Sequence, residues 1–121
     1  MIKLSTRVVA QQTVSGLHDG RGTLNGGRAL DRPALGGGAW QFVDYWRLPP
    51  GTSIGEHLHV EGYELYFVTA GRGVMTTNGV ASEVAAGDLI LNEPGDRHML
   101  ENTGEEALTC LVTAVIDAAK G

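Results

Sequence analysis

The stretch GEHLHVEGYELYFVTAG, residues Gly55–Gly71, decides how the rest of the chain is interpreted. It contains two histidines one residue apart, His57 and His59, followed by glutamates at Glu61 and Glu64. Residues two apart point about 200° away from each other around an α-helix, but they share one face of a β-strand. Glycines bracket the stretch, and no apolar spacing of three or four residues runs through it, so we expect a strand.

The size and glycine content of the chain indicate a single, turn-rich domain. A chain of 121 residues is long enough to bury roughly two-thirds of its unfolded surface in one core. Its 18 glycines are about twice the usual share of roughly 7%, which favours turns over long helices.

The charge and the cysteine content limit the possible binding partners and the expected cellular compartment. The net charge is −5 and the few cations are scattered, which argues against nucleic acid and anionic membrane surfaces as partners. Cys110 is the single cysteine and lies in an apolar run, so we expect a buried, unreactive thiol and a reducing, cytoplasmic setting. The chain shows no apolar stretch of signal-peptide or membrane-span length.

Short apolar segments separated by glycine-rich turns follow one another from residue 39 to residue 116. The Asn78-Gly79 pair predicts a two-residue type I′ hairpin between two of them. Many short strands with such turns are typical of an all-β antiparallel barrel or sandwich. The expected segments cover residues 39–48, 52–60, 61–71, 72–79, 80–87, 88–96, 97–105 and 107–116.

The first third of the chain is less regular. Residues 1–14 carry short apolar runs, which predict a half-buried or edge strand. Residues 15–38 are rich in glycine and basic residues, and we expect a long connection with at most one short strand near Thr23 and Leu24. We therefore expect residues 1–38 to pack on a barrel formed by residues 39–121 or on a dimer partner, and the chain to close with a short helical turn.

The histidines can form one side of a metal site. On a strand, His57 and His59 have Cα atoms about 6.6 Å apart and point to the same side. Glu64 begins the next apolar segment after a turn, so a hairpin would bring its carboxylate back beside them, and His98 follows a Pro-Gly turn from which it could complete the site. Three imidazoles and a carboxylate suit Fe, Mn, Ni, Co or Zn ions better than Ca or Mg.

Two motifs resemble those of the cupin superfamily. The first, G-x5-H-x-H-x4-E-x6-G, is matched from Gly51 to Gly71 at every fixed position. The second, G-x5-P-x-G-x2-H-x3-N, is matched by Gly87, Gly95, His98 and Asn102. Pro94 directly precedes Gly95, where the family usually has one residue between them, so the local turn departs from the pattern while the position of His98 does not.

The resemblance implies a double-stranded β-helix, or jelly-roll barrel, that holds one metal ion through His57, His59, Glu64 and His98. Cupins with this ligand set include dioxygenases, oxalate-type decarboxylases, isomerases and cyclases, so the resemblance does not choose the reaction. We expect a metal-dependent enzyme acting on a small organic molecule, with oxygenase or with lyase or cyclase chemistry. A non-catalytic cupin that binds or senses a small molecule is the alternative.

One position bears on the substrate. Oxalate-converting cupins typically carry an arginine three residues before the first histidine of the pair, and here that position is Ile54. The resemblance therefore implies a largely uncharged substrate with two neighbouring oxygens rather than oxalate.

Other residues near the motifs are weaker candidates. Tyr66 shares strand parity with Glu64, so its hydroxyl is expected near the metal, where it could orient a substrate or stabilise an oxyanion, although a core tyrosine is an equal alternative. Glu61 lies in the turn and is expected to be a solvated rim charge. His18 has no partner spacing and is expected to be a solvated loop residue. Two arginines, Arg47 and Arg97, are minor candidates for binding a carboxylate.

Small cupins of this type commonly pair through exchanged edge strands. The segment Ile2–Val9 is the candidate donor, since such pairing would protect an exposed sheet edge. We therefore expect a homodimer.

Overall fold

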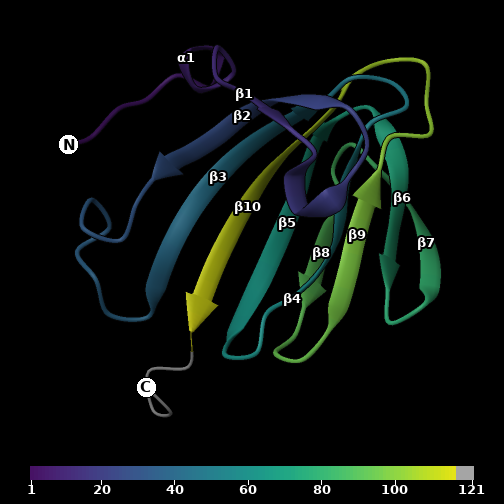
Figure 1. The fold of residues 1–121 in the computed structure, drawn as a ribbon. Helices are drawn as coiled ribbons and strands as arrows, with labels where there is room; N and C mark the ends of the chain where they lie inside the picture. The colour runs from purple at the N-terminus through teal and green to yellow at the C-terminus, as the bar shows by residue number, and fades with distance from the viewer. Residues whose placement is uncertain (117–121) are drawn as a thin grey trace.

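The computed structural model describes residues 1–116, and its strands form two antiparallel sheets that face each other (Figure 1). The larger sheet has six strands in the order β1-β2-β3-β10-β5-β8, and the smaller has four in the order β4-β9-β6-β7. The expected all-β jelly-roll barrel is therefore confirmed. The strands are β1 (Thr13–Ser15), β2 (Thr23–Leu30), β3 (Trp40–Leu48), β4 (Ser53–Leu58), β5 (Gly62–Ala70), β6 (Arg72–Thr77), β7 (Val80–Ala85), β8 (Leu89–Asn92), β9 (Arg97–Glu101) and β10 (Leu108–Ile116).

The hydrophobic core lies between the two sheets. Inward-facing residues alternate with outward-facing ones along the long strands, as in β10, where every second residue from Leu108 to Ala114 is buried. Cys110 is one of them, so the expectation of a buried thiol is confirmed. The most deeply buried apolar residues are Leu24, Leu48, Ile54, Val68, Met75, Leu100, Leu108, Cys110 and Val112.

Two turns that matter to the sequence motifs have the expected chemistry. Asn78 and Gly79 both have positive φ, 51° and 80°, and form the two-residue hairpin between β6 and β7. Asn102, which ends the second motif, is buried, and its amide donates hydrogen bonds to the carbonyl oxygens of Leu48 and Glu106 at 2.8 and 2.7 Å. Asn102 therefore fixes the loop between β9 and β10 instead of taking part in a metal site.

The N-terminal third differs from the expectation for residues 1–14 and for the connection that follows. The edge strand expected within residues 1–14 is confined to the start of β1 at the sheet edge, and a helical turn, α1 (Thr6–Val9), stands before it. Ser5 caps this turn by accepting a hydrogen bond from the Arg7 N–H. The segment proposed to exchange between subunits is therefore not a strand in this chain.

The second difference is the length of β2, which has eight residues where at most a short strand was expected. The glycines of this segment predicted a loop, but the structure uses them in a strand. A Cβ at Gly26 would overlap the Tyr45 carbonyl of the neighbouring strand β3. Glycine here permits two backbones to approach closely rather than marking a loop.

A short 3-10 segment, η1 (Leu17–Asp19), connects β1 and β2 and lies on β4. At the other end, β10 continues to Ile116, so part of the expected closing helical turn is strand, and the remainder, residues 117–121, lies outside the described residues. Among residues 1–116, no helix is long and apolar enough to cross a membrane.

Candidate metal centre

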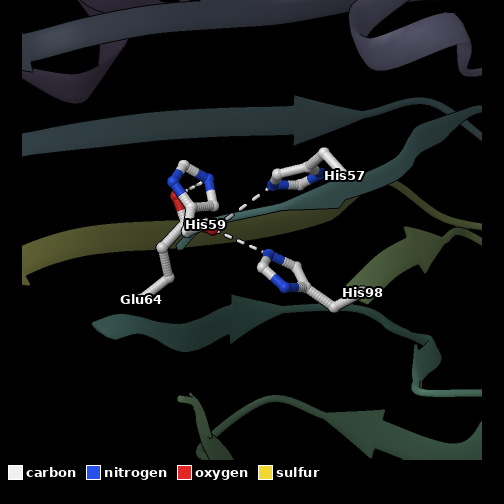
Figure 2. Close-up of side chains that lie close together, drawn as sticks. All are labelled: His57, His59, Glu64 and His98. Atoms are coloured by element: carbon white, nitrogen blue, oxygen red, sulfur yellow. Dashed lines mark hydrogen bonds and ion pairs between the residues drawn. The ribbon is translucent and has the colours of Figure 1, made fainter. Parts of the chain in front are cut away.

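Three histidines and one glutamate converge inside the barrel from three separate parts of the fold (Figure 2). His57 lies on β4, His59 directly follows it, Glu64 lies on β5, and His98 lies on β9. Each offers one donor atom, and the four atoms lie within 4.8 Å of one another. The structure thus brings together all four residues that the sequence motifs single out as metal ligands.

Strand pairing explains how His57 and His98 meet. A β-bulge between Ile54 and His57 shifts the register of β4 against β9, and this shift places His57 directly opposite His98. Figure 2 shows the two rings pointing to the same side, toward Glu64, and their centroids are 4.2 Å apart.

A tight turn leads into β9 and contains Pro94 and Gly95, where the sequence differs from the second motif. The Asp96 N–H donates to the Glu93 carbonyl at 3.0 Å, which closes a four-residue turn with Pro94 and Gly95 at its centre. Gly95 has a φ of 88°, so the Pro-Gly order suits a type II turn. The Gly95 N–H also donates to the His59 carbonyl at 2.8 Å, which ties this turn to the segment that carries the second histidine.

The carboxylate of Glu64 is the hub of the cluster. Its Oε1 lies 2.7 Å from His98 Nε2 and 3.3 Å from His57 Nε2, and its Oε2 lies 3.0 Å from His59 Nε2. Burial by itself would raise the pKa of Glu64, but the close contacts with the three histidine rings outweigh it and hold the pKa far below its usual range. The carboxylate is therefore ionised, and its contact raises the pKa of His59.

The protonation of His57 shows why this cluster suits a cation. Its Nδ1 lies 2.9 Å from the Gly55 carbonyl, which can only accept, so Nδ1 carries the proton. In the neutral ring with this tautomer, the Nε2 lone pair faces the lone pairs of Glu64, an arrangement that a cation between them would stabilise. His59 Nε2 is also buried, and its contact with Glu64 lacks hydrogen-bond geometry, so this atom too has no hydrogen-bond partner. These residues fit a divalent transition metal.

Tyr66 lies beside the cluster, as its strand parity with Glu64 predicts. Its side chain is buried, and its ring meets the His98 ring edge-on with centroids 5.7 Å apart. Burial, followed by the charge of Glu64, raises its pKa well above 10. The phenol therefore stays protonated and is available as a hydrogen-bond donor.

A cavity of about 370 Å³ opens over the cluster and is lined by His57, His59, Glu64 and Tyr66. Such a volume is in the range of small-molecule sites. Glu61 is exposed and does not line the cavity, as expected for a rim charge. The apolar wall consists of Leu17, Phe42, Trp46, Ile54 and Val112.

His18 lies against this site, which the sequence did not predict. Its ring stacks on the His57 ring with centroids 3.9 Å apart and an angle of 11° between the planes, and it lines the cavity. His18 also has a φ of 52°, in the left-handed region. The contact exists because β4 carries Gly55 where η1 crosses it, and a Cβ there would overlap the His18 carbonyl. The glycines at Gly20 and Gly55, whose backbones lie against each other, were the only signal of this contact in the sequence. Glycines alone do not show which two segments of a chain come together.

Arg28 is the second residue that sequence reasoning missed. It lines the cavity from β2 although its side chain is 52% exposed, whereas the two arginines considered from the sequence, Arg47 and Arg97, are exposed and do not line the cavity. Its Nε donates to Asp44 Oδ1 at 2.8 Å. The expectation of a largely uncharged substrate rested on Ile54, which does lie in the cavity wall. The positively charged side chain of Arg28 lines the same cavity.

Comparisons with known proteins agree with this geometry. A family model described as "Cupin domain" matches residues 44–114. A protein named "Oxalate-binding protein" from Thermotoga maritima is 31% identical over 108 residues, which cover 89% of this chain and 88% of the relative. The "Tetracenomycin polyketide synthase protein TcmJ" from Streptomyces glaucescens is 28% identical over 96 residues, which cover 79% of this chain and 62% of the relative.

Solved structures show the same likeness. A crystal structure from Thermotoga maritima, described as a predicted oxalate decarboxylase, superposes with a TM-score of 0.90 at 27% identity. The match covers 96% of this chain and all of the other. With both motifs in register, a family match over more than half of the chain and a relative above 30% identity, this chain belongs to the cupin family.

Proposed function

We propose that this chain is a metal-dependent cupin enzyme that acts on a small organic molecule with two neighbouring oxygens. His57, His59, Glu64 and His98 would hold one divalent transition metal ion, which the donor set restricts to Fe, Mn, Ni, Co or Zn. When bound, such an ion supplies Lewis-acid polarisation of a chelated oxygen or, as iron, manganese or nickel, chemistry with O₂. The reaction classes to assay are accordingly those of oxygenases and of lyases or cyclases.

The convergence of the four donor atoms within 4.8 Å carries this proposal. Structural polar clusters satisfy their own hydrogen bonds, whereas here the buried His59 Nε2 has no partner and the His57 lone pair faces a carboxylate. One cation at the point where the four side chains meet would satisfy these donor atoms together.

The other residues of the cavity have defined tasks in this proposal. The Gly55 carbonyl holds His57 in the tautomer that presents Nε2 to the ion. Tyr66 donates a hydrogen bond from its protonated phenol to an oxygen of the bound molecule, which would stabilise negative charge that develops there. The apolar wall keeps bulk water away from this oxygen and strengthens the contact.

A second candidate function is binding without turnover, in which the metal holds a ligand. The name of the Thermotoga maritima relative, "Oxalate-binding protein", favours it, and the same name makes oxalate the first ligand to test. The solved structure described as a predicted oxalate decarboxylase points to the same molecule with a reaction attached. Both candidates need the same metal centre and differ only in whether the ligand is converted.

Elemental analysis of protein purified without added metal or chelator tests the shared centre. We expect about one transition metal ion per chain in the wild type and almost none in Glu64→Gln or in the double variant His57→Ala, His59→Ala. Glu61→Gln, which changes an exposed glutamate of the adjoining turn, is the matched control and should keep the ion. Wild-type protein that also refuses added Mn, Fe, Co, Ni and Zn would overturn both candidates.

Turnover assays on the metal-loaded protein separate the two candidates. Oxalate, diketones, enols and catechol-like compounds are incubated with the protein, while O₂ uptake is recorded and the products are followed by NMR. Conversion that is lost in Glu64→Gln supports the enzyme, whereas tight binding of one compound without conversion supports the binding function.

A further inference from the structure

We infer that Arg28 binds the far end of the substrate, so that the cavity takes an organic anion larger than oxalate. One end of this molecule would chelate the metal with two oxygens, and the other would carry a separate carboxylate. The inference rests on the proposed function, because it places the chelating end on the metal held by the three histidines and Glu64. It adds a substrate class and a specificity residue from outside both motifs.

Two neighbours hold Arg28 in place. Arg28 and Asp44 are directly opposite each other on β2 and β3, and the Arg28 Nε donates to Asp44 Oδ1 at 2.8 Å. The guanidinium carbon also lies 3.9 Å from the centre of the Phe42 ring, a cation–π contact. These two contacts restrict the rotamers of a side chain that is 52% exposed, so less freedom is lost when a ligand binds.

The hydrogen-bonding capacity of Arg28 exceeds what the protein uses. A guanidinium has five N–H donors, and among residues 1–116 only its Nε has a hydrogen-bond partner. The two terminal nitrogens therefore remain available at a cavity that Arg28 itself lines. Their planar fork matches the two oxygens of a carboxylate.

The charges in the cavity favour an anion only when Arg28 is counted. Glu64 and Asp44 are the two carboxylates that line it, and together they would balance a divalent ion bound to neutral histidines. Arg28 then leaves a net positive charge in a partly enclosed space, where charges interact more strongly than in water.

The shape of the cavity argues for a longer molecule than oxalate. Oxalate has no carbon between its carboxylates, whereas the cavity of about 370 Å³ has an apolar wall that includes Phe42, Ile54 and Val112. Such a wall offers nothing to a fully polar ion but favours a hydrocarbon segment between two polar ends.

Two ligands that differ only at the far end test the inference by isothermal titration calorimetry on Mn-loaded protein. 2-Oxoglutarate and 2-oxopentanoate share the chelating end, but only the first has a second carboxylate. We expect wild-type protein to bind 2-oxoglutarate at least about tenfold more tightly, the effect of one charge-assisted carboxylate contact. Arg28→Gln should abolish this preference, because it weakens the binding of 2-oxoglutarate far more than that of 2-oxopentanoate, and it should leave the affinity for Mn unchanged, while Arg28→Lys should restore part of the preference.

The control variant is Arg47→Gln, which removes an exposed arginine of β3 that does not line the cavity and should bind like the wild type. Thermal melting of each variant verifies its fold. A wild type that does not distinguish the two acids, or an Arg28→Gln protein in which both acids weaken equally, would overturn the role of Arg28 but not the metal site. Protein that binds no Mn would overturn the proposed function together with this inference.

Discussion

The hydroxyl group of Tyr66 decides whether this residue only packs in the core or also contacts the substrate. Its raised pKa keeps the phenol protonated beside the metal cluster, so it can donate one hydrogen bond. We expect Tyr66→Phe to keep the fold and the metal content but to weaken oxalate binding about threefold to tenfold, the worth of one hydrogen bond. The measurement is calorimetric titration with oxalate beside Tyr63→Phe, which alters an exposed tyrosine of the same strand. Unchanged oxalate binding in Tyr66→Phe would return Tyr66 to a packing role.

Cys110 should be chemically silent in the folded protein. Burial, with a smaller contribution from Asp44, raises the pKa of its thiol from 9.0 to about 12. Because the pKa is higher in the folded state, folding retains the thiol proton: this contribution to stability is complete below pH 9 and is lost as the pH rises toward 12. We expect no reaction with a disulfide reagent at pH 8 until the protein is unfolded. Rapid labelling of folded protein would contradict the burial of this residue.

At the residue scale, the sequence predicts the ligands but not their surroundings. His57 and His59 are two apart on a strand, so local geometry alone places them on one side, and the motifs supply the other two ligands. Arg28 and His18 reach the cavity through long-range packing of the N-terminal third. No local spacing encodes such packing, and sequence reasoning missed both residues.

At the scale of elements, close contact between backbones explains most differences from expectation. Glycine-rich sequence usually indicates loops, yet β2 needs glycine because β3 lies so close to it, and β4 needs Gly55 because η1 crosses it. The motif segments were predicted well, since alternation and turn chemistry are local properties. The N-terminal strand is shorter than expected because Ser5 caps a helical turn before it.

The contact between η1 and β4 gives a prediction for Gly55→Ala. The new methyl group would overlap the His18 carbonyl, so η1 must move and the His18 ring must leave His57. We expect the free energy of unfolding to fall by about 1–3 kcal/mol, as in other overpacked sites. Urea unfolding measures this, with Gly62→Ala as the control, since its nearest atom would be 3.3 Å away. Equal stability of the two variants would show that η1 does not rest on β4.

At the scale of the whole molecule, the expected homodimer stays a prediction. The donor segment is a helical turn, but β5 and β8 carry a row of outward apolar side chains that a second copy would cover. In the strand pairing, Leu65 lies opposite Leu91 and Phe67 lies opposite Leu89. Their exposed fractions are 37% for Leu65, 39% for Phe67, 66% for Leu89 and 54% for Leu91.

Light scattering tests this pairing. We expect a mass of about twice the 12.8 kDa of the chain, and a shift toward the single-chain mass in Leu89→Lys, because a buried lysine destabilises an apolar interface. Val80→Lys is the control, since Val80 is 71% exposed but lies in the β6–β7 hairpin. A wild-type mass near 12.8 kDa would refute the homodimer.

The relation between the N-terminal third and the rest of the barrel is a property of the whole molecule. We propose that residues 1–38 and residues 39–121 fold together as one domain, because β1 and β2 continue the sheet of β3, and η1 and β2 carry His18 and Arg28 of the cavity wall. Removal of the first third would therefore take away Arg28 and His18 as well as a sheet edge.

The strand order of the large sheet has a consequence for folding during synthesis on the ribosome. Because β10 lies between β3 and β5, those two strands have no common neighbour until β10 has been translated. A nascent chain that already carries the four residues of the candidate metal site still lacks the middle of its barrel wall, and a stop codon shortly before residue 108 would leave both strands with unpaired edges open to aggregation.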